Sequence, residues 1–302
     1  MPNSARRQLD LIDILPHLSP RDRLLLSLLS DHLVLTSSQI SASLFSSLRM
    51  AQHRLHQLHS LELVDRFAPP RSRLRGGSGP TRWVLGRLGF DLHAAGQRGS
   101  FTSTRAARQR LAHLAESPTL QHLLGVNGFF TDLMAHARTH RDTDLQRWWS
   151  ESETARRFVG VHPDGHGLWR DGDRVVGFFL EYDTGSENLP RLVEKLAAYE
   201  RLARGGGPTY PVLFCLHSSE RERHLHAALG EVASRCPIAT TVRANGANGA
   251  LDGPAGAVWA LVGHDPQQRR RLGDLPSDHG PDHPRNPNWH AGQLTLHHRA
   301  PQ

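Results

Sequence analysis

The sequence predicts an α/β (α+β) protein of two domains. Three short helical patterns and two strand-like segments occupy the first hundred residues, and strand and helix signals then alternate over residues 119–263. Charge divides the chain in a similar way. The first 110 residues carry 16 arginines against 7 acidic residues, whereas the remainder carries 20 basic and 22 acidic residues. We therefore expect a basic, anion-binding domain joined to a mildly acidic domain with another task.

The first domain is expected over residues 15–98 and opens with three helices. Ser19 followed by Pro20 is a helix-start signal, because serine caps exposed backbone N–H groups and proline suits the first turn. Leucines then recur at helical spacing. Thr36 and the pair Ser46-Ser47 mark the starts of two further helices.

Two strand-like segments, residues 61–67 and 83–85, flank a loop over residues 69–80 that is rich in Pro, Gly and Arg. Three helices followed by such a hairpin are the layout of a winged helix-turn-helix, whose third helix enters the major groove of DNA. The apolar positions of that third helix are Leu48, Ala51, Leu55 and Leu58. The sequence thus predicts that the opposite face of this helix is free for contacts.

The predicted DNA contacts come from the third helix and from the tip of the loop. The helix offers Arg49, Gln52, His53 and Arg54, and the loop offers Arg71, Arg73 and Arg75. Arginine and glutamine suit bidentate contacts with base edges, and arginines among glycines suit phosphates. An ordinary solvated helix face and a flexible arginine-rich linker are the alternative interpretation of the same residues.

Residues 99–118 are expected to form a connector, residues 119–263 a second domain, and residues 264–302 a disordered tail rich in Pro, Gly and His. The second domain starts with a helix from residue 119. The strands expected after it are residues 145–149, 167–170, 175–182, 210–216 and 257–262, with helices over 189–204 and 219–232. This order predicts a mixed sheet flanked by helices.

Acidic residues and one lysine mark a candidate catalytic site in this second domain. Asp164 precedes one expected strand, and Glu181 and Asp183 end the next, where strand alternation directs both to one face. Lys195, the only lysine among the 36 basic residues, falls in the following helix. Carboxylates suit Mg²⁺, and a nearby ammonium suits the attacking water or the phosphate. We therefore expect Asp164, Glu181 and Asp183 to bind Mg²⁺ beside Lys195.

These residues resemble a known pattern. Asp164 and Glu181 resemble the Pro-Asp … Asp/Glu-x-Lys motif of the restriction-endonuclease-like superfamily, the PD-(D/E)XK type. More narrowly, a winged helix followed by residues 163–165, 181–187 and 195–199 looks like the replication-relaxation family, over roughly residues 15–262. The resemblance implies a plasmid- or mobile-element-linked protein that acts on double-stranded DNA. It also implies replication or mobilisation proteins as partners and a Mg²⁺-dependent endonuclease activity.

The chain departs from the nuclease motif at Asp183, which stands where the motif has lysine. In some members of the superfamily the lysine lies on the following helix, as Lys195 does here. The superfamily often has a further acidic residue on its first helix, where this chain offers Asn127 and Asp132. The alternative for Asp164 is that it is an ordinary turn residue and binds no metal. The corresponding functional alternative is a degenerate nuclease fold in a DNA-binding accessory protein or a transcriptional regulator.

Composition excludes several other classes. Cys215 and Cys236 form no disulfide framework and lack zinc-ligand spacing. The expected location is the cytoplasm, because no signal peptide is recognisable and the apolar run at residues 24–35 is too short for a bilayer. Histidines at 224 and 226 fit a solvated helix. The Trp148-Trp149 pair fits the core better than a stacking surface.

Overall fold

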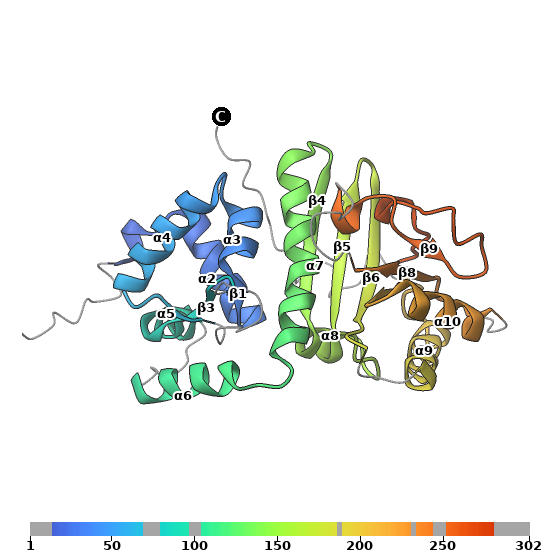
Figure 1. Cartoon of the computed structure of the whole chain (residues 1–302), viewed down its shortest axis with the longest axis horizontal. Helices are drawn as coiled ribbons and strands as arrows, with labels where there is room; N and C mark the ends of the chain where they lie inside the picture. The colour runs from blue at the N-terminus through green and yellow to red at the C-terminus, as the bar shows by residue number, and fades with distance from the viewer. Residues whose placement is uncertain are drawn as a thin grey trace, which may run out of the picture. The chain divides into compact units, whose positions relative to one another are not determined.

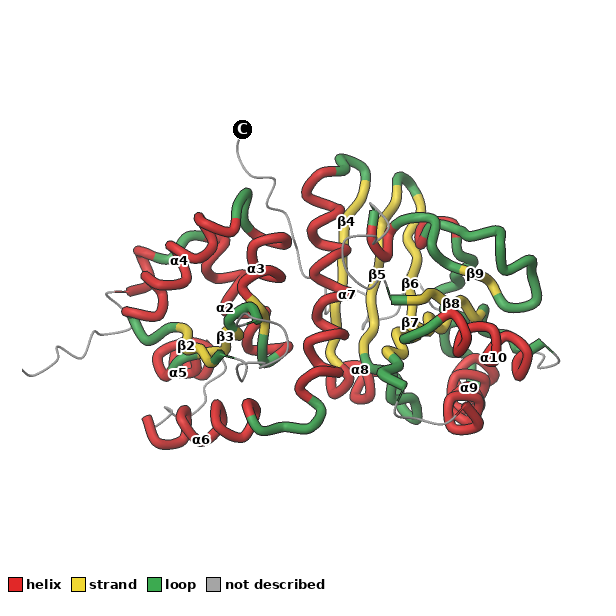
Figure 2. The backbone as a smooth tube through the Cα atoms, in the orientation of Figure 1, coloured by secondary structure: helices red, strands yellow, loops and turns green. Residues whose placement is uncertain are grey.

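The computed structural model describes residues 14–68, 79–96, 104–185, 189–230, 234–243 and 252–280. Two compact units divide the chain between Asn127 and Gly128. Figure 1 labels their helices and strands, and Figure 2 colours the same backbone by secondary structure. The predicted mixed α/β class is confirmed, since helices accompany a three-stranded sheet in the first unit and a six-stranded mixed sheet in the second.

The first unit consists of short helices and a small antiparallel sheet. In chain order its elements are η1 (Leu15–His17), α2 (Pro20–His32), β1 (Leu35–Thr36), α3 (Ser37–Leu44), α4 (Leu48–Ser60), β2 (Val64–Phe67), β3 (Arg82–Leu85), α5 (Arg87–Gly96) and α6 (Thr104–Ala115). The sheet has the strand order β1-β3-β2 with antiparallel pairing throughout.

Hydroxyl caps begin the first three α-helices at the predicted residues. Ser19 caps α2, and its side chain accepts from the backbone N–H of Asp22 while the carboxylate of Asp22 accepts from the backbone of Ser19. Thr36 caps α3 with the same reciprocal bonding, and Ser47 caps α4. Each cap satisfies backbone donors that the helix itself leaves unpaired. Local chemistry therefore fixes where these helices start.

The connector expected over residues 99–118 contains a helix that packs on the first unit. Leu111 and Leu114 of α6 pack against the buried cluster of Val34, Val84 and Leu120. In the small sheet, Trp83 is fully buried, and its indole N–H donates to the Ser37 hydroxyl at 2.9 Å. The apolar side of α6 therefore contributes to the core of this unit.

The second unit is built on the six-stranded sheet. Helix α7 (Leu120–Thr139) contains the boundary between the units. After it come β4 (Thr143–Ser150), α8 (Glu151–Arg157), β5 (Gly165–Asp171), β6 (Arg174–Tyr182), α9 (Leu189–Arg204), β7 (Val212–Leu216), α10 (Ser219–Leu229), β8 (Ile238–Val242), η3 (Gly253–Ala255), β9 (Ala260–Leu261) and η4 (Leu272–Asp274). The strand order is β4-β5-β6-β7-β8-β9, with parallel pairing between β6, β7 and β8.

The two faces of the sheet carry different layers. On one face Phe130 of α7 stacks against Trp148 and Phe178, with ring centroids 4.9 and 5.9 Å apart. Helices α9 and α10 lie on the other face (Figure 1). Their apolar side chains are buried in one cluster with Phe179 and Phe214. Because side chains alternate along a strand, Glu181 lies on the α9 face with Phe179. No helix in the described part of the chain is long and apolar enough to cross a membrane.

Residues 264–280, expected as part of a disordered tail, instead pack on the second unit. Leu272 and Leu275 are fully buried. The Ser277 hydroxyl accepts from the Gly177 N–H and donates to the Gly177 carbonyl, both at 3.0 Å. Strand β7 starts pairing only at the level of Phe179, so Ser277 satisfies backbone groups of β6 that β7 does not reach.

Replacing Leu272 with Ala is expected to destabilise the protein by about 2–5 kcal/mol, because it leaves a cavity in a fully buried position. Urea denaturation of wild type and variant measures this difference. The matched control is Gln268→Ala, at an exposed position of the same segment, which is expected to change stability by less than about 0.5 kcal/mol. Equal midpoints for Leu272→Ala and wild type would contradict the packing of this segment.

Candidate functional site

The centre of the candidate site is the carboxylate of Glu181, near the carboxyl end of β6. Its residue is only 2% exposed. The Lys195 ammonium donates to Oε2 at 2.9 Å, and the Tyr199 hydroxyl donates to Oε1 at 2.6 Å. Lys195 and Tyr199 are four residues apart on α9, so they lie on one face of that helix. Two of the residues predicted for the site, Glu181 and Lys195, are therefore in direct contact.

Asp164 lies beside this pair. It immediately precedes β5, whose first residue Gly165 pairs with Leu180 of β6. Asp164 Oδ2 accepts from the backbone N–H of Tyr182 at 2.6 Å, which holds its side chain at the end of β6. The turn before β5 thus brings a second carboxylate next to Glu181.

Burial raises the pKa of Glu181 to about 7, and the negative charge of Asp164 acts in the same direction. Lys195 and Tyr199 oppose this rise because they stabilise the ionised carboxylate. Burial and the nearby Glu181 charge raise the pKa of Tyr199 well above its ordinary value, so its hydroxyl stays protonated and donates. The site therefore combines two acidic groups that repel each other with one ammonium.

Asp183 directly follows β6, but its carboxylate bonds to α10 and not to the Glu181 site. The Arg221 guanidinium of α10 contacts both of its oxygens, with Nη2 at 3.2 Å from Oδ1 and a shorter contact from Nε to Oδ2. Gly185 N–H also donates to Oδ1 at 2.8 Å, and His217 Nδ1 lies 3.5 Å from Oδ2. This ion pair anchors the loop after β6 to α10. Arg221 could not be predicted from the sequence, since one arginine among 35 carries no distinguishing signal.

Asn127 and Asp132, the two candidates on α7 for a further site residue, lie away from Glu181. The Asn127 amide donates to the carbonyls of His32 and Val34, at 3.0 and 2.7 Å, within the first unit. Burial of the carboxyl group raises the pKa of Asp132 to about 6, although the residue as a whole is exposed. Its charge acts on Tyr182 and Cys215, which are paired neighbours in the sheet. Tyr182 points to the face opposite Glu181, so Asp132 is not part of the Glu181 site.

The outer face of α4 exposes most of the residues predicted to contact DNA. Arg49, Gln52 and His53 are exposed. Arg54 is instead bound to the buried Asp22 of α2, with Nε at 2.9 Å from Oδ1 and Nη2 at 2.6 Å from Oδ2. Its guanidinium ties α4 to the start of α2. Leu48, expected on the apolar face, is 45% exposed beside Arg49. The predicted loop arginines Arg71, Arg73 and Arg75 lie outside the described residues.

A hollow of about 480 Å³ adjoins this surface between α4 and the start of α2. Arg21, Arg49 and His53 line it together with Phe45, Met50 and the Arg54–Asp22 pair. The Arg21 guanidinium lies 5.1 Å from the centroid of the Phe45 ring. Since Arg54 compensates the only acidic residue in this lining, the hollow carries net positive charge and suits an anionic group.

A separate cluster of His136, His140 and Asp252 brings potential metal-ligand atoms within 4.8 Å of one another. The two imidazoles are stacked with centroids 3.7 Å apart and planes within 4° of parallel. An imidazole ligand binds a metal in its own ring plane at about 2.0–2.1 Å. One ion cannot lie in both of these parallel planes, so the observed arrangement is a stacked pair rather than a formed metal site.

Comparison with models of protein families matches residues 26–212 to the family described as replication-relaxation. The matched range begins within α2 and ends at the first residue of β7, so it includes Asp164, Glu181 and Lys195. Comparisons with curated proteins and with solved structures gave no match. The match covers more than half of the chain.

Glu181 is expected to make stability depend on pH. Its pKa is about 7 in the folded protein against an ordinary 4.5, so its favourable contribution is complete below pH 4.5 and is lost as pH rises through 7. Each unit of pKa difference corresponds to about 1.4 kcal/mol. In Glu181→Gln this contribution is absent. Wild type should therefore lose stability relative to the variant between pH 4.5 and 8, as measured by urea denaturation.

The control for this pH series is Glu220→Gln, because Glu220 is an exposed acid at the start of α10. Its stability curve is expected to run parallel to that of wild type. A Glu181→Gln curve that also runs parallel to wild type would show that Glu181 has an ordinary pKa in the folded protein.

Proposed function

Since the chain belongs to the replication-relaxation family, we propose that it binds double-stranded DNA through its first unit and cleaves DNA phosphodiesters, with Mg²⁺, in its second. The observation that carries the catalytic part is the buried Glu181 carboxylate in contact with Lys195 and beside Asp164. Perturbed acids with a specific charge partner are typical of functional sites. The site would belong to a restriction-endonuclease-like domain of the PD-(D/E)XK type.

The first unit supports DNA binding by its order of elements. Three helices, α2 to α4, are followed by the β2–β3 hairpin, with β1 completing the small sheet, and this is the order of a winged helix-turn-helix. Helix α4 is then the recognition helix and exposes Arg49, Gln52 and His53 for base edges or phosphates. The 16 arginines among the first 110 residues supply the charge. Arg54 contributes by fixing α4 against α2.

Replacing Arg71, Arg73 and Arg75 together with Ala is expected to weaken binding to every duplex sequence. Each lost phosphate contact should reduce the slope of log K against log salt by about 0.9. Arg49→Ala is expected to weaken binding and to reduce discrimination between sequences. Fluorescence anisotropy of labelled duplexes at several salt concentrations measures both effects.

The control is Arg204→Ala, at an exposed position of α9 in the second unit, which should leave affinity and salt slope unchanged. An unaltered salt slope in the triple variant would show that the loop does not contact DNA phosphates. An unaltered sequence preference in Arg49→Ala would show that Arg49 of α4 does not read the base sequence.

The second unit offers a donor set that fits Mg²⁺. Asp164 and Glu181 supply hard oxygen ligands, and their mutual repulsion makes a cation favourable between them. Asp183 is held by Arg221, so in this proposal it supports the site from the adjacent loop. When bound, the metal would polarise the scissile phosphate and lower the pKa of a water molecule.

Lys195 would orient the attacking water or a phosphate oxygen. Its ammonium is a compact charge held at 2.9 Å from Glu181 Oε2, while its side chain remains 30% exposed and therefore reachable from solvent. Arginine is larger, planar and permanently charged, so it does not replace a lysine that must approach a water nucleophile closely. This requirement gives a reason for one lysine to persist in a chain with 35 arginines.

Supercoiled and linear DNA incubated with the protein and Mg²⁺ or Mn²⁺ tests the activity. Wild type is expected to nick or cut, and Glu181→Gln and Lys195→Met are expected to lose about a hundredfold or more in rate. Lys195→Arg should remain strongly impaired although it keeps the charge. Glu220→Gln is the control with wild-type rate, and thermal denaturation verifies that each variant is folded. Absence of cleavage by wild type, or equal cleavage by all variants, would defeat the catalytic assignment.

A further inference from the structure

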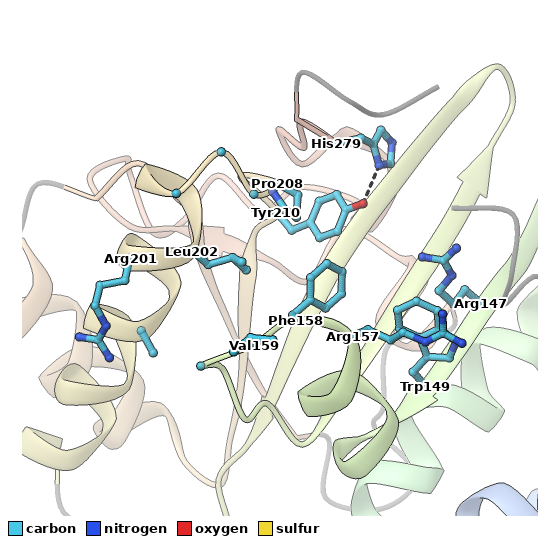
Figure 3. A pocket seen from close by; sticks show the side chains of 15 residues that line it. Arg147, Trp149, Arg157, Phe158, Val159, Arg201, Leu202, Pro208, Tyr210 and His279 are labelled. Carbon is cyan, nitrogen blue, oxygen red and sulfur yellow. Dashed lines mark hydrogen bonds between the residues drawn. The ribbon is translucent and has the colours of Figure 1, made fainter. Parts of the chain in front are cut away.

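A second cavity, of about 450 Å³, opens on the α9 side of the second unit (Figure 3). We call it the arginine-lined cavity, because Arg147, Arg157 and Arg201 line it whereas its described lining includes no acidic residue. The loop of residues 205–207 and the ring of Tyr210 complete its walls. Its volume lies in the usual range for sites that bind small molecules. The residues of the Glu181 site do not line it.

Two of the arginines gather around one indole ring. The guanidinium carbon of Arg147 is 4.1 Å from the centroid of Trp149, and that of Arg157 is 5.4 Å from it. Arg147 is only 2% exposed, and burial together with the Arg157 charge lowers its pKa to about 10. It therefore stays cationic at neutral pH. Arg157 also pairs with Glu153 through Nε at 2.8 Å. Two buried or half-buried guanidinium groups at one cavity wall favour an anion with several oxygens.

Aromatic rings form the middle of the cavity. Phe158 and Tyr210 lie between the arginine pair and the end of α9, and both are labelled in Figure 3. Tyr210 is fixed in place, since its ring stacks on His166 with centroids 5.4 Å apart and its hydroxyl is 2.9 Å from His279 Nδ1. Gly177 makes room for this ring, because a Cβ there would lie 2.4 Å from it. Tyr210 is only 3% exposed and Phe158 is half-buried, so Phe158 offers the larger ring surface to a planar ligand group and Tyr210 the wall behind it.

The two ends of the cavity differ in polarity. At the end formed by residues 205–207, the backbone N–H groups of Gly205, Gly206 and Gly207 donate to carbonyls of the last turn of α9. These amides are committed to the helix, whose carboxyl end carries partial negative charge. Arg201 also lines the cavity near the end of α9 but is exposed, whereas Arg147 is buried and Arg157 half-buried. An anion is therefore favoured at the end beside Arg147 and Arg157, where two shielded guanidinium groups lie together. Hydrogen-bond donors, such as the amino group of a base, suit the end of α9.

We propose that the arginine-lined cavity binds a nucleoside monophosphate unit, with the phosphate at Arg147 and Arg157 and the base against Phe158 and Tyr210. Such a unit is available from a free nucleotide or from the phosphorylated end of a DNA strand. The proposal goes beyond the nuclease assignment and does not rest on it, since it requires neither Mg²⁺ nor cleavage.

Isothermal titration calorimetry of the full chain in EDTA, with 5′-dAMP, deoxyadenosine and inorganic phosphate, tests the site. The nucleotide is expected to bind at least tenfold more tightly than either fragment, because only the nucleotide uses both ends of the cavity. Arg157→Gln should weaken nucleotide binding at least tenfold. The matched control is the adjacent Arg156→Gln, at a residue whose side chain is 70% exposed and does not line the cavity, and it should leave binding unchanged.

The opposite results are equally specific. Equal affinity for nucleotide and deoxyadenosine would show that the arginines do not bind the phosphate group. Equal affinity for nucleotide and inorganic phosphate would show that the cavity binds anions in general and does not bind the base. No binding of any ligand, or unchanged binding by a folded Arg157→Gln, would also overturn the proposal. Comparing one short oligonucleotide with and without its 5′-phosphate distinguishes the sources. Tighter binding of the phosphorylated form, lost in Arg157→Gln, would assign the site to a strand end.

Discussion

The burial of the Glu181 carboxylate is the constraint around which the second unit is arranged. Removing a carboxylate from water costs several kcal/mol unless charged and hydrogen-bonding partners offset it. Both partners, Lys195 and Tyr199, come from α9, so the position of this helix on the sheet and the charge state of the site are linked. Burial, and after it the negative charge of Asp164, keeps the pKa of Glu181 high despite these partners. The result is an acidic centre that remains receptive to further positive charge.

Helix α9 also separates two kinds of charge along its length. Its Lys195 meets the acids at the end of β6, whereas three positions later Ala198 begins its contribution to the arginine-lined cavity. An acidic site and a basic cavity thus share one helix and one face of the sheet without neutralising each other. This separation allows the two sites to be perturbed independently, since the substitutions that change one leave the lining of the other intact.

Much of the first unit was predictable because its signals are local. Ser19, Thr36 and Ser47 each bond to a backbone group three residues away, so a helix start needs no knowledge of the rest of the fold.

The strand β8 was not predicted. Its sequence mixes Ile238 and Val242 with two threonines, and the buried Thr240 hydroxyl is bonded to Glu222 and His226 of α10. That pairing arises from tertiary structure, which a short sequence window does not contain.

The same distinction holds for the candidate site. Glu181 was identified because an acid that ends a buried apolar strand requires a partner, and Lys195 because it is unique in composition and lies on the next helix. Arg147 and Arg221 resembled any other arginine until the fold placed one against Trp149 and the other against Asp183. The preference for Trp148 and Trp149 as core residues is confirmed by their burial. Their sequence alone did not indicate that Trp149 also borders a cavity.

The hydrogen bonds between Ser277 and Gly177 have a consequence for the order of folding during synthesis. They join residues 100 positions apart, and the buried Leu272 and Leu275 belong to the same late segment. Domains generally fold as units while the chain emerges from the ribosome. The backbone of β6 is therefore fully paired only after residues 272–277 have been synthesised. Until then, the N–H and carbonyl of Gly177 are unpaired groups on the part of the β6 edge that β7 does not reach, and such an edge can pair with another chain.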